Sequence, residues 1–201
     1  MKNIIRIGNG QGFWGDSVDA PVNLAKGGPL DYLTLDYLAE VTLSIMQRQK
    51  LKYPDAGYAH DFIDLIRRIW PEIKNNGLKV ITNAGGVNPQ ACREALHQLS
   101  ENYSDKIKIG VIQGDNIYPD LQDLHKKGVS FNHMDTGQSF NEIADKVYSA
   151  NVYINSFTIC EALTEGAQIV LAGRVSDPGL ALGPCIYEYG WKQNEYNRTA
   201  A

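Results

Sequence analysis

The 201-residue sequence lacks the features that mark several large classes of protein. It has three cysteines, Cys92, Cys160 and Cys185, which are far apart and never form a C-x-x-C pair, so we expect reduced, mostly buried thiols. It has no basic excess, with 19 Lys and Arg against 23 Asp and Glu, which disfavours nucleic acid as a partner. No run reaches the roughly 18 apolar residues of a membrane span, and no signal-peptide h-region precedes the first strand. We therefore expect a cytoplasmic protein with no membrane span.

Common catalytic signatures are missing as well. The sequence contains no G-x-S-x-G, no P-loop and no H-E-x-x-H. What it does have is ordinary globular composition, 43% hydrophobic and 21% charged, at a length that suits one domain. The sequence ends in GWKQNEYNRTAA without a cap or a final packed element, so we expect an incomplete polypeptide.

Hydrophobic patterns predict strands and helices in alternation. Apolar runs indicate strands at 4–7, 30–33, 78–82, 106–112, 151–154 and 168–171. Helical spacing indicates helices at 36–49, from 62 to 70 or 77, and at 88–99, 118–126, 143–147, 158–166 and 177–189. A Thr158-x-x-Glu161 capping box is expected to open the helix at 158–166. The least regular stretch, 114–139, is expected to be a long loop region. The alternation predicts a single α/β domain over 1–201, with a largely parallel sheet, helices on both faces and Rossmann-like layering.

Three glycine turns each follow a predicted strand and precede a predicted helix. They are GNGQGFWGDS (8–17), NAGGVNP (83–89) and AGRVSDP (172–178), with Asp16 or Ser17, Asn88 and Asp177 as expected helix caps. In a parallel sheet all three lie at the carboxyl edge, where open α/β folds bind ligands. Glycines also simply make tight turns, and that alternative stays open. The residues predicted to bind a ligand or cofactor are Gly10, Gly12, Asn83, Gly85, Gly86, Gly173 and Asp177.

The first turn matches the dinucleotide fingerprint G-x-G-x-x-G through Gly10, Gly12 and Gly15. A Rossmann helix would begin inside this run, which would place Pro21 near its middle, where proline breaks helices. We therefore interpret the match as a false positive for NAD and expect Phe13 and Trp14 to form part of a pocket wall. Asp36 stands about where a ribose-binding acid is expected, but it is also a good N-cap.

Three charged residues are the predicted catalytic set. Asp16 is a general base or merely a helix cap, and Asp115, which follows a predicted strand, has a role at the ligand edge or in a turn. Arg174 directly follows a strand in a glycine turn, where a guanidinium suits a carboxylate or phosphate, the alternative being a structural ion pair. His133 and Asp135 are an acid/base pair or two metal ligands, but no third ligand is identified, so no metal site is predicted.

Several long segments resemble one family. RIGNGQGFWGDS, GGPLDYLTLDYLAE, ITNAGGVNP and LAGRVSDP are similar to the acyclic terpene utilisation family, AtuA type, and the resemblance covers essentially the whole chain. Members of that family are longer, so the resemblance implies that this chain is the N-terminal portion of such a protein. The family is associated with bacterial breakdown of citronellol, geraniol and related terpenes through coenzyme A thioesters, and its genes often lie beside biotin-dependent acyl-CoA carboxylases.

The resemblance implies a function in broad terms and brings no catalytic set. The first hypothesis is an enzyme, or part of one, that acts on a terpenoid or branched acyl-CoA or the free acid, as a hydro-lyase or a hydrolase. No cofactor is expected beyond a coenzyme A thioester as substrate. The second hypothesis is a non-catalytic partner of acyl-CoA carboxylase subunits. In either case the expected partner is a small molecule or a protein, and we expect a homo-oligomer.

Overall fold

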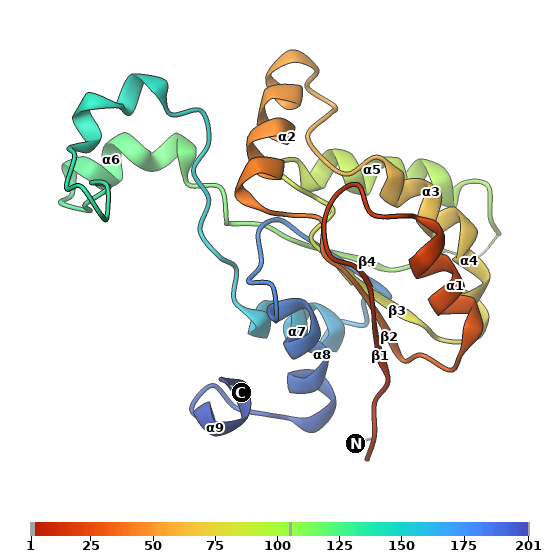
Figure 1. The fold of residues 1–201 in the computed structure, drawn as a ribbon. Coiled ribbons are helices and arrows are strands. Elements are labelled where there is room, and N and C mark those ends of the chain that lie inside the picture. Colours follow the sequence, from red (N-terminus) through yellow and green to blue (C-terminus); the bar gives the residue numbers. More distant parts are fainter. Residues whose placement is uncertain (1–2, 105, 201) are drawn as a thin grey trace.

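The computed structural model describes residues 3–104 and 106–200 and shows an α/β fold around one parallel sheet (Figure 1). Its five strands lie in the order β1 (Ile7–Gln11), β2 (Tyr32–Leu35), β3 (Lys79–Thr82), β5 (Ile169–Ala172) and β4 (Ile109–Ile112). All four neighbouring pairs are parallel. The predicted α/β class with a largely parallel sheet is therefore confirmed.

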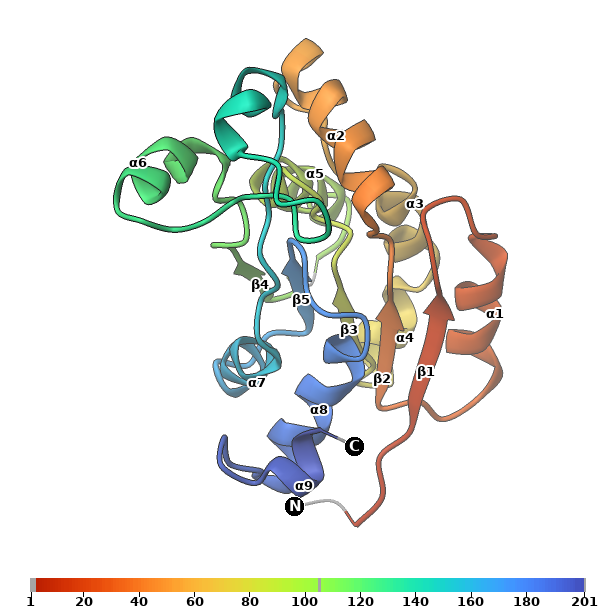
Figure 2. The same cartoon turned by 60° about the vertical axis from the view of Figure 1, so that its left-hand side comes forward.

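Helices cover both faces of the sheet, as predicted (Figure 2). One face carries α1 (Asp19–Gly27), α3 (Asp61–Arg68), α4 (Trp70–Asn75) and α5 (Pro89–Ser100). The other carries α7 (Ser156–Thr164) and α8 (Gly179–Tyr189), followed by the short α9 (Tyr196–Thr199). The helix α2 (Glu40–Lys52) rises beyond the carboxyl ends of the strands (Figure 1). No helix among the residues described is long and apolar enough to cross a membrane.

The larger core lies between the sheet and the helices of the first face. The helix α3 shows why this face forms: Phe62, Leu65 and Ile66, at helical spacing, are fully buried, while Asp64 and Arg67 pair on the outer side at 2.8 Å. Removal of such apolar surface from water is the main stabilising contribution to the fold.

The segment between β4 and α7 contains a projecting arm, which we define as residues 113–150 (Figure 1). It contains α6 (Leu121–Lys126) and three 3-10 turns, at Tyr118–Asp120, Phe140–Glu142 and Ala144–Lys146. The predicted helix at 118–126 is thus found, and the one at 143–147 is a 3-10 turn. The arm has a small apolar centre of its own, where Phe140 is buried against the rings of Phe131 and His125.

Element boundaries near the N-terminus differ from the prediction. β1 begins at Ile7 and continues through Gly8 and Gly10, which were expected to lie in a turn. Gly8 pairs with Leu33 of β2, and Gly10 lies where the register shifts between Asn9 and Gln11. A Cβ on Gly10 would lie 2.6 Å from Pro21 of α1, so glycine lets the helix pack directly on the strand. Pro21 lies in the first turn of α1, where a missing N–H is tolerated.

Three further predictions are wrong. The segment 151–154 is not a strand, because it makes only isolated bridges, Asn116 to Asn151 and Ile154 to Val175. The helix α7 is capped by Asn155, whose side chain accepts a hydrogen bond from the N–H of Phe157 at 2.7 Å, and not by the Thr158 capping box. The helix α2 begins at Glu40 after an extended Ala39, so Asp36 is not its cap.

Candidate functional site

Four polar residues follow the carboxyl ends of the inner strands and of β4. Asp36 follows β2, Asn83 follows β3, Asp115 follows β4 and Arg174 follows β5. All four belong to one hydrogen-bonded network, joined through the backbone at Leu38. The predicted gathering of Asn83, Asp115 and Arg174 at one edge of the sheet is therefore found.

The Arg174 side chain joins three segments: the start of α2, the segment at Tyr153 and its own turn after β5. Its side chain is 7% exposed, and its Nη1 donates to the carbonyls of Leu38 at 2.9 Å and Val175 at 3.2 Å and to Asp177 Oδ1 at 2.8 Å. Its Nη2 donates to the hydroxyl of Tyr153 at 3.3 Å and lies 3.8 Å from a carboxylate oxygen of Glu40. The guanidinium also stacks over the Tyr153 ring, 4.6 Å from its centroid. Arg174 therefore forms the structural ion pair that was one of the two predicted roles.

Burial and hydrogen bonding act in opposite directions on Arg174. Burial works against its charge, but hydrogen bonds to Tyr153 and Asp177 outweigh that effect, so the pKa of the guanidinium is raised. Asp177 is committed to this pair, and it does not cap α8, whose N-cap position is Pro178. The cap predicted at Asp177 is therefore wrong.

Asp115 is a buried carboxylate, 4% exposed, that fixes the turn after β5. Its Oδ2 accepts hydrogen bonds from the backbone N–H of Arg174 and from Asn151 Nδ2, each at 2.9 Å. A Cβ on Gly173 would collide with this carboxyl group, so the glycine is what lets the acid approach. The structure thus gives Asp115 and Gly173 an architectural role, while their predicted parts in catalysis and binding stay predictions.

Asp36 is held differently from the other acids of this edge. Its Oδ1 accepts hydrogen bonds from Asn83 Nδ2 at 2.6 Å and from the backbone N–H of Leu38 at 3.2 Å. Asn83 is fully buried and is itself fixed, because its Oδ1 accepts from the N–H of Tyr37 at 2.7 Å. Both hydrogen bonds use the same oxygen of Asp36. Its other oxygen, Oδ2, has no hydrogen-bond partner among the residues described.

The surroundings favour the protonated form of Asp36. Burial raises the pKa of this half-buried carboxyl, and the negative charge of Asp177 adds to the rise. The hydrogen bonds from Asn83 and Leu38, and the charge of Arg174, oppose the rise without cancelling it. A carboxyl group with a raised pKa and an unpartnered oxygen can both accept and return a proton.

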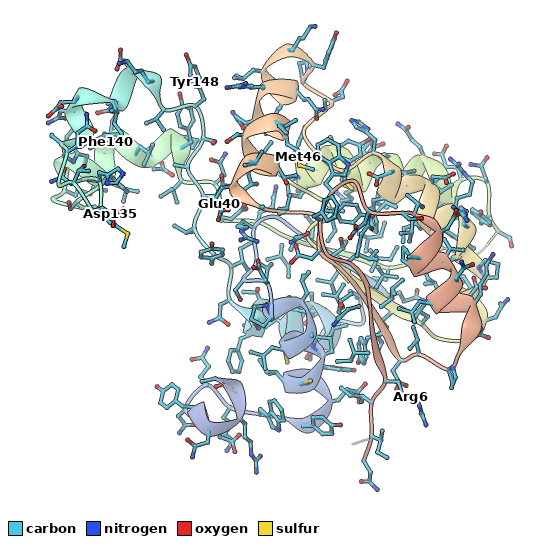
Figure 3. The ribbon with its side chains drawn as sticks, in the orientation of Figure 1. Arg6, Glu40, Met46, Asp135, Phe140 and Tyr148 are labelled. Atoms are coloured by element: carbon cyan, nitrogen blue, oxygen red, sulfur yellow. The ribbon has the colours of Figure 1, made fainter. Side chains whose placement is uncertain are left out.

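A groove of about 310 Å³ adjoins this network. It lies between the first turns of α2 and the segment that returns from the arm, and Figure 3 shows Glu40 at the base of α2 beside that segment. We call it the edge groove; it is lined by Glu40, Leu43, Ser44, Ser149, Ala150, Asn151, Tyr153 and Arg174. A larger hollow, near Arg6, lies at the amino ends of the strands, away from the edge where such folds bind ligands (Figure 3).

The loop after β1 does not join this network through any hydrogen bond in the part of the chain described. Asp16 Oδ2 accepts hydrogen bonds from the N–H groups of Gly12 at 2.8 Å and Phe13 at 3.3 Å, so it closes its own loop. The N-cap position of α1 is Val18, so the cap predicted at Asp16 or Ser17 is wrong in position, although Ser17 Oγ accepts a hydrogen bond from the N–H of Asp19 at 3.3 Å. The indole of Trp14 donates to Asp61 at 3.0 Å, and neither Trp14 nor Phe13 lines the edge groove.

Packing explains the second glycine turn. A Cβ on Gly85 would lie 2.7 Å from the carbonyl oxygen of Ala172, on the neighbouring strand. Gly86 has φ +55, and a Cβ there would meet the carbonyl of Gly57 at 2.6 Å. Gly12, in contrast, is exposed and has room for a side chain. Whether Gly10, Gly12, Gly85 and Gly86 also contact a ligand stays a prediction.

His133 and Asp135 lie in an exposed turn of the arm (Figure 3). His133 Nδ1 accepts hydrogen bonds from the N–H groups of Asp135 and Thr136, each at 3.2 Å, so this ring nitrogen shapes the turn. No group of three or more metal-binding side chains is found among the residues described.

Sequence reasoning missed Asp36 as a site residue. It treated this acid as a ribose-binding or capping residue, because helical spacing continues back to it from α2. A signal was present, since Asp36 immediately follows the apolar strand YLTL, which places it at the carboxyl edge of the sheet.

Comparison with known proteins gives one match. A search of curated proteins and a search of solved structures each find no significant match. The family model described as acyclic terpene utilisation family protein AtuA matches residues 5–201. This match covers nearly the whole chain. The chain therefore belongs to the acyclic terpene utilisation family AtuA.

Proposed function

We propose that this chain is an enzyme, or part of one, that binds an acyclic terpenoid acid in the edge groove, as the free carboxylate or its coenzyme A thioester. The observation that carries the proposal is the groove itself, which lies at the carboxyl edge and combines a guanidinium with apolar wall residues such as Leu43 and Ala150. Family membership supports a substrate from acyclic terpene breakdown. Together they favour a ligand with an acidic or thioester head and a hydrocarbon chain.

The size of the groove limits what it can hold. About 310 Å³ is at the lower end of the range for small-molecule sites, which runs from roughly 300 to 1,000 Å³. The acyl part of a thioester fits that range, whereas the nucleotide part of coenzyme A would lie outside on the surface. Exposed apolar residues next in sequence to groove residues, Val41 and Ile45 on α2, Tyr148 at the end of the arm and Val152 after it, offer further contact for a hydrocarbon chain.

A thermal-shift assay tests the proposal with citronellyl-CoA, geranyl-CoA, the two free acids and coenzyme A alone. A ligand at 100 times its Kd stabilises the native state by about 2.7 kcal/mol, or roughly 5–10 °C for a domain of this size. Ser44→Trp fills the groove from α2 and should abolish the shift. Leu51→Trp adds the same ring at an exposed position of that helix outside the groove and should retain it. No shift with any of the five compounds would contradict the proposal.

The second candidate function is a non-catalytic partner of an acyl-CoA carboxylase. The observation that favours it is the arm, which projects from the sheet and presents Met134, 98% exposed, and Val129, 42% exposed. A protein partner that covered these side chains would remove their apolar surface from water. Co-purification with carboxylase subunits that is lost in Met134→Asp, with no thermal shift by any thioester, would favour this function over the enzyme.

A further inference from the structure

We propose that the edge groove selects ligands whose head is an uncharged carbonyl group, such as a thioester, over free carboxylates, and that Glu40 sets this preference. The proposal rests on the function proposed above and narrows its two forms of the ligand to one. It makes Glu40 a specificity-determining residue of the groove, outside the set of site residues predicted from the sequence.

The cation of the groove is already matched by groups of the same chain. Of the described residues that line the groove, Arg174 is the one that carries a positive charge, and its side chain is only 7% exposed. Its Nη1 has two N–H groups and already three acceptors, which are the carbonyls of Leu38 and Val175 and the carboxylate of Asp177. This nitrogen therefore has no N–H group left for a ligand carboxylate.

Glu40 lies where a ligand carboxylate would have to bind the other nitrogen. It lines the groove from the first turn of α2 (Figure 3), and its Oε1 is 3.8 Å from Arg174 Nη2. The same oxygen accepts a hydrogen bond from the hydroxyl of Tyr153 at 3.4 Å, and that hydroxyl accepts one from Nη2 at 3.3 Å. A carboxylate that approached Nη2 from the groove would displace Glu40 or bind beside its negative charge.

The balance of charge disfavours an anion in the groove. Glu40 and Asp177 together bring two negative charges to the single positive charge of Arg174. A third carboxylate would meet repulsion from both, which is how like charges reject a ligand. The side chain of Glu40 is 80% exposed, so water screens its charge, and we expect an effect on affinity of about fivefold.

Uncharged donors in the groove suit a carbonyl oxygen instead. The hydroxyl groups of Ser44, on α2, and of Ser149, on the returning segment, have no hydrogen-bond partner among the residues described. A hydroxyl group can donate to a carbonyl oxygen without any change in the charge of the site. The carbonyl group of a thioester can thus be held in the groove without repulsion from Glu40.

Isothermal titration calorimetry of the full chain tests this with two ligands that share one hydrocarbon chain, citronellate and its N-acetylcysteamine thioester, which has no phosphate. The wild type should bind the thioester about fivefold more tightly, or better. Glu40→Gln removes the charge and nearly keeps the shape, so it should raise the affinity for citronellate about fivefold and leave that for the thioester within about twofold. Glu101→Gln, at an exposed acid after α5 and outside the groove, should change neither affinity.

The outcomes separate this proposal from the proposed function. If the wild type binds neither compound, the proposed function is refuted. Citronellate bound by the wild type as tightly as the thioester, or with an unchanged Kd in Glu40→Gln, overturns the role of Glu40 and leaves the proposed function standing. An equal gain for both ligands in Glu40→Gln, or the same gain for citronellate in Glu101→Gln, also overturns it, because the charge of Glu40 would then not distinguish the two heads.

Discussion

Gly173→Ala should destabilise the protein, and the whole effect should come from the collision of the new Cβ with the carboxyl group of Asp115. A Cβ at residue 173 would lie 2.5 Å from the Cγ and Oδ2 of Asp115, so the carboxyl group must move away. It then loses its hydrogen bonds from the Arg174 N–H and from Asn151 Nδ2. Hydrogen bonds to a charged group contribute about 1.5–3 kcal/mol each, so we expect a loss of about 3 kcal/mol or more.

A double-mutant cycle isolates this collision. Asp115→Ala alone should also lose about 3 kcal/mol, since the same two hydrogen bonds disappear. In that background the carboxyl atoms are gone, so Gly173→Ala should cost little more, and the coupling free energy should be about 3 kcal/mol. Each single variant should lower the melting temperature by roughly 6–12 °C, and the double variant by no more.

Urea denaturation of the wild type, the two single variants and the double variant at one pH measures the four free energies of unfolding that make up the cycle. Free energies that add up in the double variant, to about 6 kcal/mol, would show that Gly173 is needed for some other reason, such as its backbone conformation. A loss well below 1 kcal/mol for Gly173→Ala alone would show that Asp115 has room to move. Either result would refute the explanation of this glycine by close approach of the acid.

Two further predictions concern ionisable groups. Because the pKa of Asp36 is raised in the folded state, its contribution to stability is present at low pH and is lost as pH rises from its ordinary range through the raised value. Asp36→Asn should therefore gain stability relative to wild type as pH rises above about 4, the ordinary pKa of an aspartate, and denaturation curves that show a constant difference would contradict this. Burial also raises the pKa of the fully buried Cys92, so iodoacetamide at mildly alkaline pH should leave this thiol unmodified in the folded chain and modify it after denaturation, as peptide mass mapping would show.

The sequence predicts the helices and strands best where local signals and packing agree. The helix α5 is expected at 88–99 and runs Pro89–Ser100, because a proline suited to the first turn precedes a clear apolar stripe. The strands β3 and β5 are short apolar runs; β3 begins one residue later than predicted, and β5 is shifted by one residue at both ends. Because all strands of the sheet are parallel, the turns that follow β3 and β5 lie at one edge, as the alternation of strands and helices predicts.

Long-range hydrogen bonds explain where the prediction fails. Helical spacing extends α2 back to Asp36, yet the helix begins only at Glu40. Side chains of other segments form hydrogen bonds with the intervening backbone: the N–H of Tyr37 donates to Asn83, and the carbonyl of Leu38 accepts from Arg174. Those partners are about 46 and 136 residues away in the sequence, so no local pattern could reveal that they hold this segment out of the helix.

The glycines of this edge first suggest close approach of a bound ligand, but the structure explains them by contacts within the protein. Gly173 admits a carboxylate of the same chain, Gly85 admits the carbonyl of Ala172, and Gly86 admits that of Gly57. Each is explained by contacts within the protein, so glycine turns alone are weak evidence for a bound phosphate. The stronger evidence lies in the side chains that these close approaches assemble: Gly173 admits Asp115, whose Oδ2 holds the backbone N–H of Arg174, and the guanidinium of Arg174 lines the edge groove.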